Sequence, residues 1–164
     1  MIEQSRRSQF TKSVFQNFET LRERSDTLFK KLLDLQRKYQ GKCIPGIGDI
    51  LVDEFKYYSD PYTTYTPNVP LAEYLVAVEK QRNPDFARFI ADCEKHERFR
   101  RLAFRHFLLN PVTRMQRYPL LLQAIIKKTD EDHIDRRYLL NCKEMIQAIA
   151  SRSDMQTAAV KQQV

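Results

Sequence analysis

Apolar residues in the first forty positions recur every three or four residues, except for one step of seven that Ser25 divides. They are Phe10, Val14, Phe18, Leu21, Leu28, Leu32, Leu35 and Tyr39. This spacing is close to the period of an α-helix with one buried face, roughly 3.6 residues per turn. Charged residues such as Lys12, Arg22 and Glu23 fall between them. The pattern predicts one long amphipathic helix over residues 10–39 that ends near Gly41.

The next segment alternates loop and helix signals. Residues 42–48 (KCIPGIG) contain two of the three glycines of the chain and a proline, which predicts a loop. Asp49 is a capping residue type and can begin a short helix that reaches Tyr58. Residues 59–67 (SDPYTTYTP) are rich in turn formers, so we expect an irregular connector packed by its own tyrosines.

Two helices are predicted between residues 70 and 95. The first begins at Pro70 and ends near Gln81, and its inward positions are expected to be Leu71, Leu75 and Val78. The second begins at Asn83 and Pro84, because Asn is favoured at the cap and Pro in the first turn. Its apolar side is formed by Phe86, Phe89, Ile90 and Cys93. The charged residues 95–101 are expected to link to the next helix.

The last third of the chain predicts two more helices. Apolar residues recur at helical spacing over residues 102–128, and Pro111 and Pro119 predict a break or kink near each. A turn is expected at residues 130–132 (DED). The final helix is predicted to bury Leu139, Cys142, Ile146 and Ile149 and to fray after Asp154.

Composition supports an all-α domain. The chain has 164 residues, 42% hydrophobic and 30% charged, as expected for one globular domain. Only 3 residues are glycine, and sheet proteins need glycine for their turns and bulges. No apolar run is long enough to span a bilayer. The three cysteines, Cys43, Cys93 and Cys142, form no C-x-x-C pair, which favours a reducing, cytosolic setting.

The residue types that usually form catalytic or metal-binding sites are not clustered in the sequence. His96, His106 and His133 have no metal-ligand spacing, so no metal site is predicted. Too few glycines are present for a phosphate-binding loop or a nucleophile elbow. The pattern therefore favours a binding protein that needs no cofactor over an enzyme that makes or breaks bonds.

Electrostatics add one candidate surface. The net charge is +7, and the densest basic group is Arg98, Arg100, Arg101 and Arg105. This group is either a solvated helix face or a docking surface for an acidic partner. A nucleic-acid role would rest on the basic pI alone, because the nearby Phe99, Phe104 and Phe107 are expected in the core and not as stacking platforms.

Residues 108–129 carry the most informative motif, LLNPVTRMQRYPLLLQAIIKKT. This segment resembles the third conserved region of Dbl-homology (DH) domains, including both prolines at the family spacing. Residues 14–18 (VFQNF) resemble the family's V-F-x-N-I segment, and residues 83–89 (NPDFARF) its N-P-x-F-x-x-F segment. Together with the loop at residues 46–50 (GIGDI), these segments are most similar in sequence to those of fungal exchange factors for Rho-type GTPases. The resemblance covers roughly residues 10–155.

The resemblance implies an elongated multi-helix bundle that acts as a guanine nucleotide exchange factor for a Rho-family small GTPase. Such domains bind the two switch regions and disturb the magnesium and phosphate site. It also implies a cytoplasmic protein that flanking domains recruit to an anionic plasma membrane. A non-catalytic helical scaffold, which docks a GTPase or a membrane surface without exchange, is the alternative function. Substituting Arg117 by Glu would separate GTPase binding from lipid binding.

The family's GTPase contacts can be carried over by position. Arg117 occupies the basic position that family members direct at the second switch region, and Gln116 lies beside it. Arg114 matches the family arginine in the same motif. Asn110 replaces the usual lysine, which removes one positive charge. Asp154 falls where many members have an asparagine that contacts the second switch region. An asparagine amide can donate a hydrogen bond there, whereas the carboxylate of Asp154 can only accept one.

The family also begins with an earlier helix, whose glutamate contacts the first switch region. Only nine residues precede Phe10 and they do not match that helix, and no pleckstrin-homology module follows. We therefore expect residues 1–164 to be a single DH-like domain that is incomplete at its N-terminus. Such a chain should expose apolar faces, exchange nucleotide weakly or not at all, and aggregate or pair with a second copy.

Overall fold

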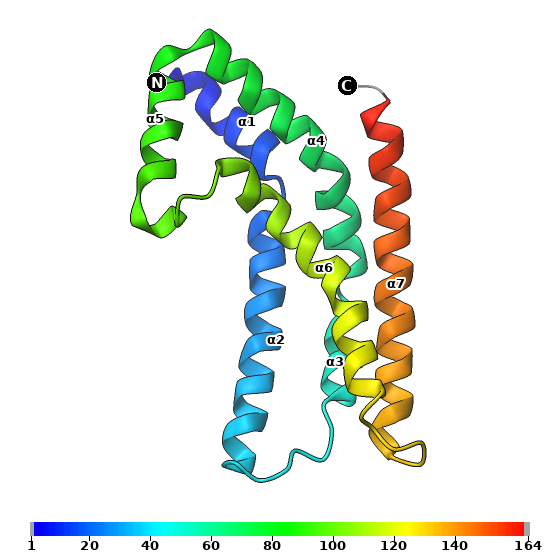
Figure 1. Cartoon of the computed structure of the whole chain (residues 1–164). Helices are drawn as coiled ribbons and strands as arrows, with labels where there is room; N and C mark the ends of the chain where they lie inside the picture. Colours follow the sequence, from blue (N-terminus) through cyan, green and yellow to red (C-terminus); the bar gives the residue numbers. More distant parts are fainter. Residues whose placement is uncertain (1, 163–164) are drawn as a thin grey trace.

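A computed structural model describes residues 2–162 of the chain (Figure 1). They form α1 (Gln4–Phe15), α2 (Phe18–Tyr39), α3 (Gly48–Phe55), α4 (Ser59–Arg82), α5 (Pro84–Lys95), a 3-10 turn η1 (Glu97–Phe99), α6 (Phe104–Ile126) and α7 (Ile134–Lys161). No strand occurs in this part of the chain, which confirms the all-α prediction. None of the helices that the structure describes has the length and apolarity needed to cross a membrane.

The helices form an elongated bundle around α7. This helix packs along α4, α3 and α6, as Figure 1 shows at its right-hand side. The segments α1, α5 and the second half of α4 form one end of the molecule, and α2 extends away from them toward the other end. α2 packs mainly against α3 and α4, and an open space separates its ribbon from α6.

The core follows the apolar stripe of α7. Leu139, Cys142 and Ile146 are completely buried and Ile149 nearly so, which confirms the stripe predicted for the last helix. Opposite them, Phe55, Tyr58 and Tyr65 form an aromatic layer of the same core. The helix does not fray after Asp154 but continues to Lys161.

The predicted single helix over 10–39 begins six residues earlier, at Gln4, and is interrupted at one point. Gln16 has a φ of 46°, which ends α1, and α2 begins two residues later. The side chain of Asn17 donates a hydrogen bond to the carbonyl of Pro61 at 2.9 Å. Asn68 in turn donates to the carbonyl of Ser13 at 3.0 Å. Hydrogen bonds between this segment and α4 therefore fix the break. The apolar periodicity of the sequence continues across residue 16 and does not indicate it.

The irregular connector expected at 59–67 is also wrong, because these residues form the first turns of α4. Pro67 and Pro70 lie inside the helix. The expectation about the tyrosines holds, since Tyr62 and Tyr65 are buried against neighbouring rings. Burial of these large aromatic side chains outweighs the weak helix propensity of the segment.

The inward face of α4 is shifted from the predicted one. Its buried apolar positions are Val69, Ala72 and Val76, whereas Leu71 is exposed and Leu75 and Val78 are only half-buried. The sequence predicts that this helix begins at Pro70. A helix that begins eleven residues earlier and packs against both α7 and α1 presents a different face.

The loop before α3 is held by α7. The carboxylate of Asp135 accepts hydrogen bonds from the backbone N–H groups of Ile47 at 3.0 Å and Gly48 at 2.8 Å. A Cβ on Gly48 would come within 2.5 Å of the Cβ of Tyr138, so only glycine fits there. The predicted capping role of Asp49 is therefore wrong, because a distant aspartate caps this helix.

Two further predictions concern the helices on either side of η1. Asn83 caps α5 as predicted, since its side chain accepts a hydrogen bond from the N–H of Phe86 at 3.1 Å. α6 is unbroken at Pro111 and Pro119 and follows a gently curved course in Figure 1. The hydroxyl of Tyr65 donates to the carbonyl of Leu108 at 2.9 Å, which ties α4 to α6 where the first proline interrupts the hydrogen-bond ladder.

Candidate functional site

Helix α6 carries four of the five predicted contact residues, and three of them lie on one solvent-facing side. Because an α-helix turns by about 100° per residue, Asn110, Arg114 and Arg117 lie within roughly 60° of one another. All three are exposed. Leu120 and Leu121 lie on the same side and are 71% and 48% exposed. We call these five residues the α6 outer face.

Arg114 is held against the aromatic core. Its guanidinium lies 4.8 Å from the centre of the Tyr118 ring. Tyr118 is buried and packs on Phe55, with 5.1 Å between ring centres. A cation over a ring face is stabilised by the ring quadrupole, which orients the side chain before any partner arrives. Arg114 therefore has both a structural contact and a solvent-facing charge.

Arg117 is different, because the described residues offer it no hydrogen bond, ion pair or ring. Its side chain is exposed at the centre of the α6 outer face, between the apolar Leu120 and Leu121. An unpaired guanidinium with exposed leucines beside it combines the two elements of a protein-binding hot spot, a planar cation and apolar area.

The two remaining predicted residues lie apart from this centre. Gln116 is exposed but points about 100° away from Arg117 around the helix axis. Asp154 is exposed on α7. Figure 1 shows α6 and α7 side by side near their connecting turn and diverging toward the end of α7 that carries Asp154. Within the described chain no hydrogen bond or ion pair joins Asp154 to an α6 arginine.

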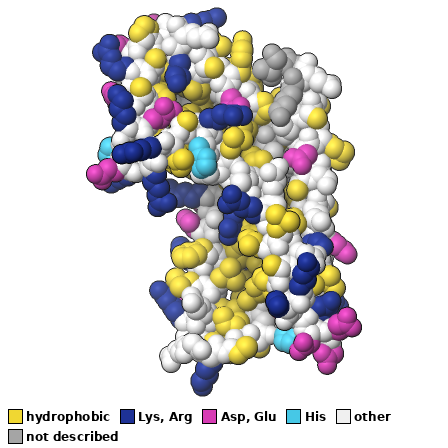
Figure 2. Space-filling view, viewed as in Figure 1, with side chains coloured by type: hydrophobic (Ala, Val, Ile, Leu, Met, Phe, Trp, Pro, Cys, Tyr) yellow, Lys and Arg dark blue, Asp and Glu magenta, His cyan; other side chains and the backbone are white. Residues whose placement is uncertain are grey.

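An apolar face adjoins the α6 outer face. Figure 2 shows hydrophobic side chains gathered in the hollow between the α2 and α6 columns. Exposed apolar residues contributed by these helices and by the end of α1 are Phe15, Phe18, Phe29, Leu121 and Ile125. Such a contiguous apolar surface is characteristic of an interaction site.

An ion pair joins α2 to α3, and only its carboxylate is buried. The ammonium of Lys31 lies 2.5 Å from one carboxylate oxygen of Glu54, whose side chain is 3% exposed. Hydrogen bonds to Glu54 and then to Asp53 raise the pKa of Lys31 above its ordinary value. The other carboxylate oxygen of Glu54 has no protein partner, nor has the neighbouring hydroxyl of Tyr58. This pair fixes α2 on α3.

The titratable groups beneath the face are unsuited to acid–base catalysis. Burial raises the pKa of Tyr58 and of Tyr62 far above the usual tyrosine value. Both phenols are therefore neutral at physiological pH. No group of three or more histidine, cysteine or acidic side chains converges within the described chain as a metal site would require. The arrangement is suited to binding a protein surface.

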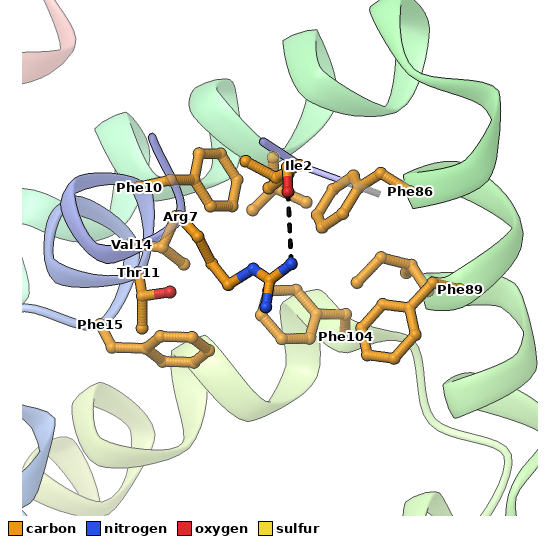
Figure 3. Close-up of a pocket in the computed structure, with 11 residues that line it drawn as sticks. Ile2, Arg7, Phe10, Thr11, Val14, Phe15, Phe86, Phe89 and Phe104 are labelled. Carbon is orange, nitrogen blue, oxygen red and sulfur yellow. Dashed lines mark hydrogen bonds between the residues drawn. The ribbon is translucent and has the colours of Figure 1, made fainter. Parts of the chain in front are cut away.

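A second concavity lies at the other end of the molecule (Figure 3). This cavity of about 240 Å³ is lined mainly by apolar side chains, and its aromatic residues are Phe10, Phe15, Phe86, Phe89 and Phe104. Arg7 points across it and donates a hydrogen bond to the carbonyl of Ile2 at 3.4 Å. Phe89, predicted on the apolar side of α5, is 49% exposed there. The molecule therefore has a second open apolar region, in addition to the hollow between α2 and α6.

The family follows from comparison with known sequences. The profile of the RhoGEF domain matches residues 2–154 of the chain. The chain belongs to the RhoGEF domain family. It is 34% identical over 160 residues to Rho1 guanine nucleotide exchange factor 3 of Schizosaccharomyces pombe, and 30% identical over 157 residues to RHO1 GDP-GTP exchange protein 1 of Saccharomyces cerevisiae. These matches include 98% and 94% of this chain but only 12% and 13% of the two relatives.

Solved RhoGEF structures share the fold. The DH/PH domains of PDZ-RhoGEF, solved in complex with activated RhoA, match with a TM-score of 0.85 at 21% identity, over 92% of this chain and 42% of that one. The DH domain of FARP2 matches with a TM-score of 0.76 at 16% identity, over 93% of this chain and 73% of that one. The helical arrangement is therefore that of a DH domain.

Sequence reasoning found the two arginines of the α6 outer face and missed its leucines. Leu121 follows Arg117 by four residues, so helical periodicity places both on one side of the helix. That signal was available in the sequence. The Lys31–Glu54 pair had no such signal, because the two residues come from different helices.

Proposed function

We propose that this RhoGEF domain binds the switch regions of a Rho-family small GTPase through the α6 outer face and promotes release of GDP. The observation that carries the proposal is Arg117, an unpaired cation between two exposed leucines within the family motif. Arg114 contributes a second oriented charge, and Asn110 a neutral polar group at the same face. Gln116 and Asp154 are proposed as peripheral contacts at its edges.

The proposed mechanism is thermodynamic linkage. A protein that binds the nucleotide-free GTPase more tightly than the loaded form weakens nucleotide binding by the same factor. Positively charged and apolar groups that hold the switch regions in the nucleotide-free arrangement are sufficient for this effect. No nucleophile, general base or resident cofactor takes part, in agreement with the neutral buried tyrosines of the site.

The proposal also concerns the location of the domain in the cell and the regions that flank it. The curated relatives are about eight times longer than the matched segment, so other regions of such proteins lie outside it. We place the domain in the cytoplasm and propose that flanking domains bring it to an anionic plasma membrane. Residues 1–164 are proposed to act as a single domain without bond-making chemistry.

The apolar hollow between α2 and α6 bears on the activity of this chain. α2 and α6 present open apolar faces of the kind that a partner surface would cover. The non-catalytic scaffold is the second candidate function, favoured by the same open hollow and by Asn110 and Asp154.

Release of a fluorescent guanine nucleotide from purified Rho-type GTPases tests the proposal, together with a pull-down on the nucleotide-free forms. Arg117→Glu should abolish binding and any acceleration of release, because it reverses the charge at the centre of the face. Arg37→Glu on α2, which pairs only with Asp34 in the exposed part of that helix, is the matched control. Binding without release would favour the scaffold. No binding by the folded wild type would refute both the exchange function and a scaffold that docks a GTPase.

A further inference from the structure

The loop between α5 and α6 presents three arginines that form no ion pair within the described chain, and the acidic residue Glu97 directly precedes the first of them. Arg98, Arg100 and Arg101 are all exposed. We call them the arginine loop. The neighbouring cations are neutralised, since Arg105 pairs with Glu73 at 2.7 Å and Lys95 with Asp92 at 3.6 Å. None of the three loop arginines has a carboxylate within ion-pair distance in the described chain.

The loop backbone is fixed from within. Phe99 packs edge-on against Phe107, with 4.7 Å between ring centres. The imidazole of His96 accepts a hydrogen bond from the N–H of Arg98 at 3.2 Å, and Glu94 accepts one from the N–H of Phe104 at 2.8 Å. The interior side of the loop is therefore occupied, and the three arginine side chains point to solvent as a group.

This arrangement is costly for the chain. Arg100 and Arg101 have φ values of 50° and 59°, in the left-handed region where a Cβ is disfavoured. Glycine or asparagine would adopt this conformation more easily. Strained backbone is found preferentially where side chains have a binding role. Three like charges held together in a strained loop are stabilised by an external polyanion.

We propose that the arginine loop docks on the anionic phospholipid headgroups of a membrane surface. Neither the phenylalanine-lined cavity nor the cavity between α4, α5 and α6 includes these arginines in its lining, so neither offers them as part of a peptide groove. The aromatic rings of Phe99 and Phe107 pack edge-on against each other, which leaves no platform for nucleotide bases. A broad, planar array of phosphate groups fits an exposed basic loop, and guanidinium groups bind phosphate in bidentate fashion.

The proposal does not depend on GTPase exchange. The arginine loop immediately precedes α6, and Arg117 lies thirteen residues after the first residue of that helix, about 20 Å along its axis. The two surfaces are separate, so each can fail without the other. Docking through this loop would hold α6 in one orientation relative to the membrane, without any contribution from flanking domains.

Vesicle flotation tests the proposal with the chain itself, because floated vesicles separate bound protein from aggregates. Vesicles of phosphatidylcholine mixed with phosphatidylserine are compared with pure phosphatidylcholine. The wild type should float with the anionic vesicles only, and added salt should weaken the binding. The triple variant R98Q/R100Q/R101Q should lower the partition coefficient by about 100-fold, from the effect of three basic residues near an anionic surface.

The matched control is R37Q/K38Q/K42Q, which removes three exposed charges near the far end of α2. It should lower partitioning several-fold less than the loop variant. Circular dichroism verifies that both variants keep the helical fold. Equal losses in both variants, flotation with neutral vesicles, or tighter binding to duplex DNA than to anionic vesicles would each overturn the proposal. Arg117→Glu should float like the wild type, which separates this proposal from that of GTPase binding.

Discussion

Helices α7 and α2 are both long and amphipathic, but they are integrated into the fold to very different extents. α7 packs against three helices and buries Leu139, Cys142 and Ile146 completely. α2 packs against two helices along part of its length and leaves Phe29 62% exposed. The same sequence periodicity therefore describes a central helix and a peripheral one. Amphipathicity predicts that a helix has a buried face, but not how many neighbours cover it.

The largest expected effect comes from the central helix. Ile146→Ala should lower the free energy of unfolding by about 2–5 kcal/mol, because Ile146 is completely buried and its loss leaves a cavity. Ile134→Ala, on the same helix at 80% exposure, should change it by less than about 0.5 kcal/mol. Urea unfolding followed by circular dichroism measures both. Similar losses in the two variants would contradict the central role of α7.

The connection between α3 and α7 is the next test. Asp135→Ala should lower the free energy of unfolding by about 2–4 kcal/mol, since the N–H groups of Ile47 and Gly48 lose their buried acceptor. Asp132→Ala, in the exposed turn before α7, is the control and should have little effect. Thermal unfolding measures the difference. An unchanged midpoint for the first variant would show that water replaces the carboxylate.

Hydrogen exchange compares the stability of α2 and α7 without any mutation. We expect the central amides of α2 to exchange faster than those of α7, because α2 can open locally with little loss of packing. Mass spectrometry of the native protein at the level of single helices measures the rates. Equal protection would mean that α2 opens only with the whole fold, or that a second copy covers its apolar face. Analytical ultracentrifugation separates these outcomes.

The smallest expected effect is a loss of stability in alkali. Burial raises the pKa of the Cys142 thiol on α7 from 9.0 to about 12, and burial raises that of Tyr65 from 10.0 to about 12. Each group is neutral in the folded state at a pH where the unfolded chain already ionises. Their stability contribution is therefore complete below pH 9 and declines between pH 9 and 12. Cys142→Ala should make the decline in urea midpoint shallower, whereas Cys43→Ala, at an exposed position, should not.

Most of the fold was predictable because the apolar stripes of α5, α6 and α7 are regular. The failures have physical causes. The break at Gln16 depends on hydrogen bonds to α4, and the helical start of α4 depends on buried tyrosines, so neither has a local signal. The family motif located Arg114 and Arg117, but the motif does not state which leucines remain exposed. The arginine loop was visible as a charge cluster, whereas the absence of ion pairs to it within the described chain required the structure.

The hydrogen bond from the N–H of Gly48 to the carboxylate of Asp135 has a consequence for how the chain folds. The two residues are 87 positions apart, so the N-terminus of α3 lacks its cap until α7 has been synthesised. Domains whose decisive contacts are distant in sequence must close large loops and fold more slowly than those with local contacts. During translation the first half of this chain therefore waits, with an unsatisfied helix end and exposed aromatic side chains, for the last helix to arrive. A cell that makes this protein needs chaperones most in that interval.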